Sequence, residues 1–112
     1  MAAIPDLDLA RIRKYCADRV PERALNQVRM EADVRGSSVT ILECRAPWRE
    51  DFGPEWSRRG MAKLKYDSAN NLWTLFWADR NGRFHLFDFI EPGSVVELLE
   101  EIELDRTSIF WG

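Results

Sequence analysis

The sequence predicts an α+β domain, in which a five-stranded, mainly antiparallel meander sheet lies between an N-terminal and a C-terminal helix. Three observations predict this fold. Apolar residues recur at intervals of three and four near both ends of the chain, as on one face of a helix. Between these segments, apolar and polar residues alternate in short runs that polar turns separate, as in antiparallel strands. One irregular stretch, residues 46–60, interrupts the alternation and predicts a long loop.

The first helix is predicted over residues 6–20. Its apolar stripe consists of Leu9, Ile12, Cys16 and Val20. Asp6 or Asp8 is expected to cap its N-terminus by accepting hydrogen bonds from free backbone N–H groups. Pro21 is expected to end the helix, because proline disfavours helical geometry at the residue before it.

A hairpin is predicted next. Residues 28–35 alternate between apolar and charged side chains, which is typical of a strand with one wet face. Gly36 and Ser37 predict the turn, and a second strand runs from Val39 to Arg45. The loop that follows contains Trp48 and Trp56. A long loop of this kind is often functional, although its tryptophans can equally well anchor it to the body of the domain.

Three further strands are predicted, over residues 61–66, 72–78 and 83–89. Asn81 and Gly82 favour a two-residue type I′ turn. That turn would place Ala78 opposite His85 and Phe76 opposite Phe87.

This register assigns side chains to the two faces of the sheet. One face, the presumed core, would carry Phe76, Ala78, His85, Phe87, Phe89, Ala62, Leu64 and Tyr66. The other would carry Trp73, Leu75, Trp77, Phe84 and Leu86 together with Lys63 and Lys65. A shift of one residue in the turn 67–71 would exchange the faces of the preceding strand, so this assignment depends on the turn.

The second helix is predicted to begin after Ser94, which can cap it with the help of Glu97. Its apolar stripe consists of Val95, Leu98, Leu99 and Ile102. Acidic residues gather toward its C-terminus, where the helix dipole disfavours them unless a basic group lies nearby. The apolar tail, residues 109–112, is expected to pack on the sheet or on a neighbouring subunit.

Composition limits the class of protein. With 112 residues, of which 46% are hydrophobic and 31% charged, the chain predicts a single globular domain over residues 1–112. Cys16 and Cys44 lie far apart and predict reduced, buried thiols. The sequence shows neither a signal peptide nor a membrane span, so we expect a cytoplasmic protein without membrane contact. The net charge is −3, and its acidic excess comes from residues 91–112, which carry six acids and one base.

Catalytic and metal chemistry find little support in the sequence. His85 is the single histidine, and the predicted register positions no carboxylate beside it, so a structural role is favoured over a general base. One histidine and two distant cysteines do not make a metal site. We therefore expect no catalytic residues, no metal and no cofactor, and lean against an enzyme.

The remaining hypothesis is a non-enzymatic interaction module that self-associates, as a homodimer, through a surface rich in tryptophan, arginine and lysine. Its residues would be Trp48, Trp56, Arg58, Arg59, Lys63, Lys65, Trp73 and Trp77. The alternative is a single-stranded nucleic-acid-binding domain that uses the same surface, because cationic groups bind phosphates and flat aromatic rings stack on bases.

Several segments carry a family resemblance. They are Arg45-Ala46-Pro47-Trp48, Trp56, the pair Ala62-Lys63 before Tyr66, Trp73 with Trp77, and the closing Ile109-Phe110-Trp111-Gly112. In these segments the chain resembles a bacterial family catalogued as domain of unknown function 3024. The resemblance covers nearly the whole chain. It implies a single domain and brings no activity with it.

Overall fold

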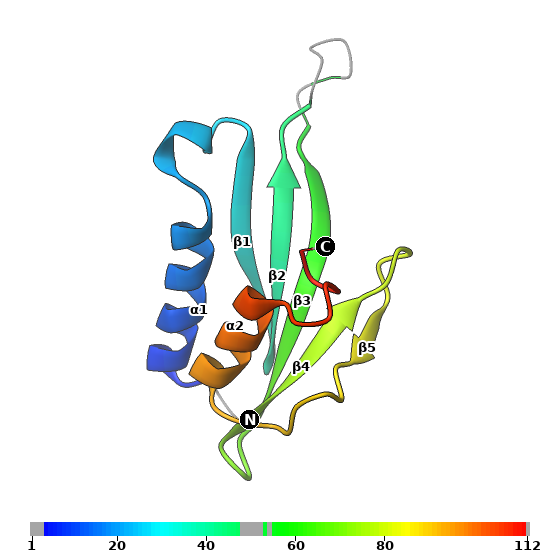
Figure 1. The fold of residues 1–112 in the computed structure, drawn as a ribbon. Coiled ribbons are helices and arrows are strands. Elements are labelled where there is room, and N and C mark those ends of the chain that lie inside the picture. Colours follow the sequence, from blue (N-terminus) through cyan, green and yellow to red (C-terminus); the bar gives the residue numbers. More distant parts are fainter. Residues whose placement is uncertain (1–3, 48–52, 54, 112) are drawn as a thin grey trace.

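The computed structural model describes residues 4–47, Gly53 and residues 55–111. The elements in order are helix α1 (Asp6–Arg19), the 3-10 turn η1 (Glu22–Ala24), strands β1 (Val28–Arg35), β2 (Ser38–Arg45), β3 (Ser57–Asp67), β4 (Leu72–Ala78) and β5 (Phe84–Leu86), and helix α2 (Val95–Leu104). The strands form one sheet in the order β1-β2-β3-β4-β5, and every neighbouring pair is antiparallel (Figure 1). The predicted α+β fold with a five-stranded meander is confirmed.

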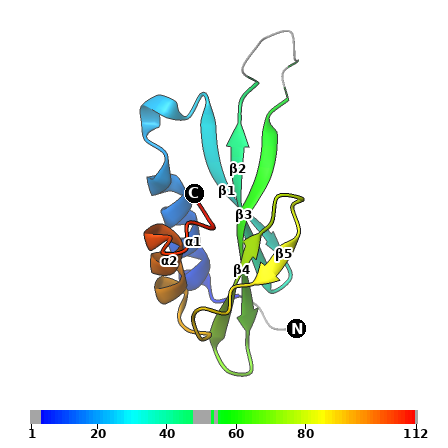
Figure 2. The same cartoon turned by 45° about the vertical axis from the view of Figure 1, so that its right-hand side comes forward.

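Both helices lie on the same side of the sheet (Figure 2), so the core is a single layer between them and the strands. α1 buries Ile12 and Cys16, and the whole predicted stripe of α2 is buried. The sheet contributes Val39, Ile41, Ala62, Leu64, Tyr66, Trp73 and Leu75. None of the helices in the described ranges is both long enough and apolar enough to cross a bilayer.

The N-terminus of α1 differs from the prediction. The helix begins after Pro5, and neither Asp6 nor Asp8 caps it. The Asp8 carboxylate instead accepts a hydrogen bond of 2.8 Å from the indole N–H of Trp73 on β4. Because Trp73 is only 1% exposed, this bond satisfies a donor that water does not reach and ties α1 to the centre of the sheet.

The first hairpin follows the prediction. Arg35 pairs with Ser38, and Gly36 between them has a positive φ of 58°. β3 begins at Ser57, four residues before the predicted start at Met61. The pairing of β2 with β3 jumps from Ala62 to Gly60, so Met61 forms a β-bulge. Met61 and Ala62 are consecutive apolar residues and interrupt the alternation along β3, and the bulge lets the pairing with β2 continue past them. The sequence pattern therefore does not reveal residues 57–60 as part of the strand.

The turn between β4 and β5 contradicts the predicted type I′ geometry. The N–H of Asp79 donates to the carbonyl of Arg83, and among residues 80–82 only Gly82 has a positive φ, of 81°. The Asp79 carboxylate accepts hydrogen bonds from the N–H groups of Asn81 (2.8 Å) and Arg83 (3.0 Å). This Asx-type capping favours a three-residue loop with glycine at its left-handed position. Phe76 therefore pairs with Leu86, one residue away from the predicted partner.

The turn between β3 and β4 shifts the register in the same way. Tyr66 pairs with Trp73, and Leu64 with Leu75. Asp67 stabilises this turn by accepting from the N–H of Ala69 and the side-chain amide of Asn70. The face assignment in the sequence prediction is therefore wrong for β4 but right for β3 and β5, because the one-residue shifts at the two turns cancel between those two strands. The tryptophans of β4 share the helix side with Ala62, Leu64 and Tyr66, whereas Lys63 pairs with Phe76 and Lys65 with Thr74 on the opposite side.

β5 spans Phe84–Leu86 rather than the predicted residues 83–89. After β5, the N–H of Phe87 still donates to the carbonyl of Leu75, and Gly93 forms an isolated antiparallel β-bridge with Trp73. Five residues thus leave the sheet between these two contacts, and Phe89, expected in the core, is 71% exposed. The predicted cap of α2 is confirmed, because the Ser94 hydroxyl accepts from the Glu97 N–H at 3.2 Å.

The contact between α1 and β4 gives a stability prediction. Asp8→Ala leaves the buried indole N–H of Trp73 without an acceptor, which should lower the free energy of unfolding by about 1–3 kcal/mol. Asp6→Ala removes the same charge from the same exposed turn and should cost less, about 0.3–1 kcal/mol. Urea denaturation measures both. Equal losses in the two variants would show that the indole bond contributes little.

The β4–β5 turn gives a pH prediction. Hydrogen bonds from His85 and from the backbone N–H groups of Arg83 and Asn81 hold the pKa of Asp79 below its ordinary value of 3.8. A carboxyl group whose pKa is depressed on folding stabilises the native state above the unfolded pKa, and this contribution is lost as pH falls through the folded pKa. Wild type should therefore be more stable than Asp79→Asn near neutral pH, and the difference should shrink below about pH 4. Denaturation curves from pH 6 to pH 2 test this, with Asp88→Asn as the control for loss of an exposed charge; a difference that does not vary with pH would contradict it.

Candidate functional site

The side of the sheet opposite the helices, called here the open face, is the candidate contact surface. Directly paired residues point to the same side, so the strand register defines its members. They are Arg29, Glu31, Asp33 and Arg35 on β1; Ser38, Thr40, Leu42 and Cys44 on β2; Arg58, Gly60, Lys63, Lys65 and Asp67 on β3; Leu72, Thr74, Phe76 and Ala78 on β4; and Phe84 and Leu86 on β5. Within the described ranges, no helix covers this face (Figure 2).

The half of the open face formed by β1–β3 is rich in basic side chains. Its cationic strip consists of Arg29, Arg35, Arg58, Lys63 and Lys65. The described residues of the open face include three acids, Glu31, Asp33 and Asp67, and the carboxylate of Asp67 bonds to its own turn. The face therefore carries a local excess of positive charge, although the whole chain has a net charge of −3.

The other half of the open face, on β4 and β5, is apolar. Its apolar strip consists of Phe76, Phe84 and Leu86. The Phe84 ring lies over Gly60, where a Cβ atom would come within 2.8 Å of the ring. The Lys63 ammonium group lies 5.8 Å from the centre of the same ring. The missing glycine side chain thus lets an aromatic ring reach from β5 across to the edge of the cationic strip.

The end of the open face where β2 ends and β3 begins contains a stacked pair. The guanidinium of Arg29 lies 4.4 Å from the ring centre of Trp56. Cys44 lies on the same end, is buried, and burial raises the pKa of its thiol. Cys16 in the core is likewise free, and burial raises the pKa of its thiol to about 11. The prediction of two reduced, buried thiols is confirmed.

The structure separates the residues that the sequence assigned to one contact surface. Arg58, Lys63 and Lys65 share the open face. Trp73 and Trp77 lie on the helix side, and so does Arg59, which pairs with Glu43. Trp56 is half-buried beneath Arg29, and Trp48 lies outside the described residues. The expected juxtaposition of lysines with the β4 tryptophans is wrong, because the register between β3 and β4 differs by one residue from the prediction.

Sequence reasoning placed Phe84 and Leu86 on the face of Lys63 and Lys65, as the structure does, but it placed Phe76 on the opposite face. Arg29 and Arg35 appeared only as the wet residues of an alternating strand. One signal was present in the sequence: Asp79 precedes Asn81 and Gly82, and an aspartate at that position favours the longer, side-chain-capped turn.

His85 lies in a different setting from the one predicted. Its Nε2 atom is 2.7 Å from an oxygen of Asp79, and its ring stacks on Trp77 at a centroid distance of 4.7 Å. It pairs with Trp77 on the helix side, not with Ala78. Asp79 is its sole hydrogen-bond partner within the described residues, so no nucleophile completes a catalytic set there. We interpret the pair as part of the turn that sets the register.

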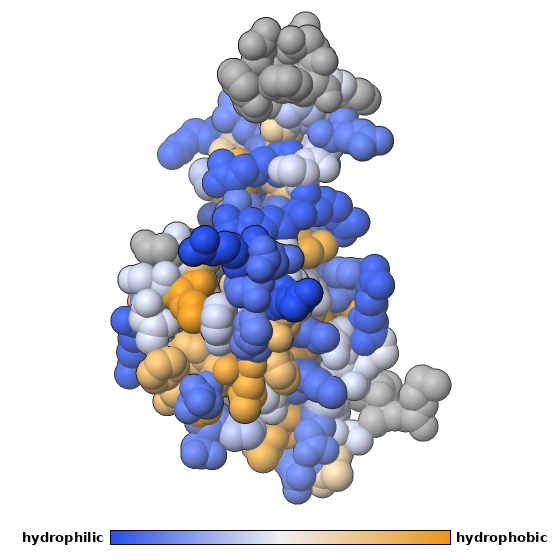
Figure 3. Space-filling model, turned by 90° about the vertical axis from the view of Figure 1, so that its right-hand side faces the viewer, coloured by the Kyte–Doolittle hydropathy of each residue, from blue (hydrophilic) through white to orange (hydrophobic). Residues whose placement is uncertain are grey.

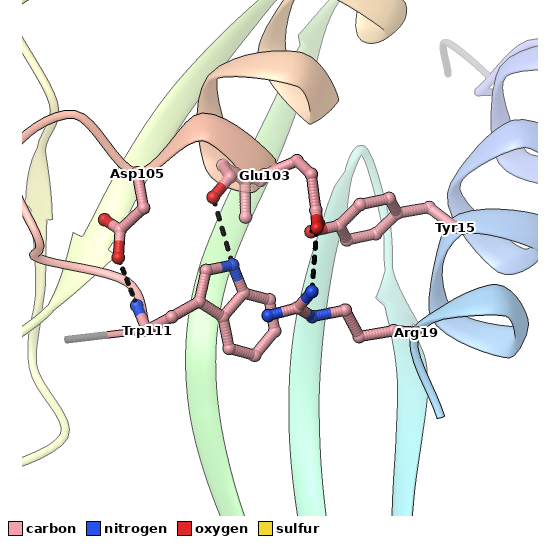
Figure 4. A network of polar contacts seen from close by, with 6 residues as sticks. Tyr15, Arg19, Glu103, Asp105 and Trp111 are labelled. Atoms are coloured by element: carbon pink, nitrogen blue, oxygen red, sulfur yellow. Dashed lines mark hydrogen bonds and ion pairs between the residues drawn. The ribbon is translucent and has the colours of Figure 1, made fainter. Parts of the chain in front are cut away.

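A polar cluster joins α1, α2 and the tail (Figure 4). Glu103 accepts hydrogen bonds from the Tyr15 hydroxyl (3.0 Å) and from Arg19 (2.7 Å), so a basic group meets the acidic end of α2. The Arg19 guanidinium also lies 4.1 Å from the ring centre of Trp111, whose indole N–H donates to the carbonyl of Ile102. Burial, followed by the contact with Glu103, raises the pKa of Tyr15. Each polar group is used to hold the two helices and the tail together, which gives the cluster a structural role.

The tail itself packs on the domain. Asp105 accepts hydrogen bonds from the N–H groups of Phe110 and Trp111. Phe110 is buried, with its ring 5.2 Å from that of Phe87. The tail was predicted to pack either on the sheet or on a neighbouring subunit, and the structure shows it packed on its own domain.

The side of the molecule at β5 presents an apolar surface. Figure 3 shows hydrophobic residues gathered on the lower half of this side and hydrophilic residues above them. Leu86 and Phe89 are exposed by 53% and 71%, and Leu104 at the end of α2 is also exposed.

The described ranges hold no group of three histidine, cysteine or carboxylate residues that could bind a metal ion.

The comparisons with known proteins bear on family and not on activity. Neither the curated proteins nor the solved structures gave a match. The family model described as domain of unknown function DUF3024 matches residues 1–112, which is the whole chain. The resemblance seen in the sequence is therefore confirmed, and the chain belongs to the DUF3024 family.

Proposed function

We propose that this protein is a non-enzymatic interaction module that binds single-stranded nucleic acid on the open face. The observation that carries the proposal is the division of that face into a cationic strip and an apolar strip that adjoin along β3 and β4. Lys63 is paired directly with Phe76, and Phe76 with Leu86. The cationic strip can bind phosphates, and the aromatic rings of the apolar strip can stack on bases. A single strand presents phosphates and free bases along its whole length.

The charges favour contact more than steering from a distance. At physiological salt, charges separated by more than about 8 Å are largely screened. The acids of residues 91–105 therefore weaken the long-range attraction of a nucleic acid but do not cancel a local contact between a phosphate and a basic side chain. Lys65 and Arg58 are exposed on the open face, so their charged groups are accessible to phosphate. Affinity should accordingly depend strongly on salt.

The apolar strip favours a single strand over a duplex. Phe76 and Phe84 are half-buried, so each ring keeps an accessible part on the open face. Stacking on an aromatic side chain requires a base that is free of its neighbours, as in single strands and loops. A paired duplex would offer its phosphates alone and leave this strip unused.

We also propose a cytoplasmic location in a bacterial cell. Two free, buried cysteines support a reducing compartment, where disulfides are rare. The family resemblance supports a bacterial source.

Self-association as a homodimer is a second candidate, favoured by the exposed apolar surface around Leu86 and Phe89. Pairing of two subunits through the edges of their sheets is less favourable. An in-register antiparallel pairing of two β1 strands would place Arg29 opposite Arg35 and Glu31 opposite Asp33, so like charges would meet. The other edge, β5, has only three residues. A dimer would therefore have to use the apolar side of the molecule rather than an edge.

Oligomeric state tests this second candidate. Light scattering coupled to gel filtration at several concentrations should give a dimer whose population falls in Phe89→Ser, because this change removes apolar area from the surface. Val96→Ser on the outer side of α2 is the control for loss of an exposed apolar residue elsewhere. A monomer at every concentration would exclude the dimer and leave the nucleic-acid proposal intact.

Binding of a labelled single-stranded oligonucleotide of about 12 nucleotides, which lies within the usual site sizes, tests the first candidate. Lys65→Gln should weaken binding and reduce the slope of log K against log salt by about 0.7, as expected for one lost phosphate contact. Lys14→Gln removes the same charge from the exposed surface of α1 and should leave the slope unchanged. Fluorescence anisotropy at several salt concentrations measures both.

The apolar strip is tested in the same titration. Phe76→Leu keeps an apolar side chain but removes the stacking surface, and should cost about 1–3 kcal/mol of binding free energy. Phe89→Leu makes the same change outside the open face and should have little effect. If wild type does not bind, or if the two phenylalanine variants bind equally well, the proposal fails.

A further inference from the structure

We infer that Glu31 and Asp33 act as built-in competitors of the nucleic-acid phosphates on the open face. The inference rests on the proposed function and names residues that regulate the same surface. In the free protein these two acids occupy two of the arginines that a bound strand would use. Binding must therefore exchange a carboxylate for a phosphate at each of them.

The first exchange site joins two strands. An oxygen of Glu31 on β1 lies 3.3 Å from the Arg58 guanidinium on β3, so the pair reaches across β2. Both side chains are exposed, by 47% and 57%. An ion pair with this exposure is weak, typically 0.2–1 kcal/mol, and a stronger ligand can open it.

The second exchange site lies near the other end of β1. An oxygen of Asp33 lies 3.1 Å from the Nε atom of Arg35, whose side chain is almost fully accessible to solvent. Arginine binds carboxylate and phosphate through the same planar set of N–H donors. The two ligands therefore exclude one another at these donors.

The other three cations of the strip are differently placed. Lys63 and Lys65 form no ion pair with an acid of the described residues, and Arg29 lies over the ring of Trp56. Lys63 and Lys65 are available for an initial contact, whereas the Nε–H group of Arg29 already donates to the carbonyl of Leu25 at 3.1 Å. Because Arg29 and Arg35 are six residues apart on one strand, the strip is about 20 Å long. A nucleic-acid strand that spans the strip can displace the carboxylates of both Glu31 and Asp33, whereas a small anion can displace only one of them at a time.

This arrangement predicts that the acids lower affinity while leaving the fold in place. Glu31→Gln should bind the 12-nucleotide strand more tightly, by up to about fivefold, which matches the strength of an exposed ion pair. The slope of log K against log salt should stay the same, because the strand contacts the same number of phosphates once it has displaced the carboxylate. Asp33→Asn should act in the same direction, and the two changes together should add.

A matched variant separates competition from a general change in charge. Glu100→Gln removes an exposed acid from α2, on the other side of the sheet, and should leave the affinity unchanged. A double-mutant cycle gives the sharper test. In the background of Arg58→Gln, Glu31→Gln should no longer increase affinity, because the guanidinium that the carboxylate blocks has been removed.

The possible outcomes are distinct. A gain in Glu31→Gln that disappears with Arg58→Gln supports the inference. Equal gains in Glu31→Gln and Glu100→Gln, or a gain that persists without Arg58, would overturn it while the proposed function stands. Absence of binding by the wild-type protein would overturn both. Urea denaturation of each variant verifies folding, and Glu31→Thr, which suits a strand, provides a second way to remove the carboxylate.

Discussion

The register between β3 and β4 determines which side chains of the sheet face the helices and which face away from them. Tyr66 lies opposite Trp73, and that single pairing sends every tryptophan of β4 toward the helices and both lysines of β3 to the other side. A shift of one residue would reverse this outcome, because side chains alternate along a strand. Asp67 and Asp79 fix the register at the two neighbouring turns by accepting backbone hydrogen bonds there. Two short polar side chains thus decide which side chains of the sheet are buried and which stay at the surface.

The helix side of the sheet is fully used for stability. Trp73 is packed in the core and bonded to Asp8 of α1, and the tail is held to α2 by Asp105. The two helices and the tail all lie against this side, so a chain of 112 residues has little left to cover the opposite side. The open face consequently keeps its lysines, arginines and phenylalanines at the surface. Its mixture of charge and apolar area is a direct result of this one-sided packing.

The sequence predicted the elements better than their alignment. Periodicity located both helices and the first hairpin, and the apolar stripe of α2 was correct in every residue. Local turn chemistry decided the rest. The Asn-Gly pair suggested a two-residue turn, but the preceding Asp79 made a three-residue loop more favourable, and Met61 formed a bulge that no alternation pattern reveals. The two lysines of the candidate site and Phe84 were therefore assigned to one face, whereas Phe76 was not, since cross-strand neighbours depend on registers that such turns set.

If the open face contacts a single strand, then Lys63, Lys65, Phe76 and Phe84 must respond together to it. An NMR titration with the oligonucleotide can follow the lysine ammonium and phenylalanine ring signals. We expect shifts at these four side chains and at Arg58, while the indole signals of Trp73 and Trp77 stay in place. Shifts centred on the two indoles and the helices, or no shifts at all, would contradict it.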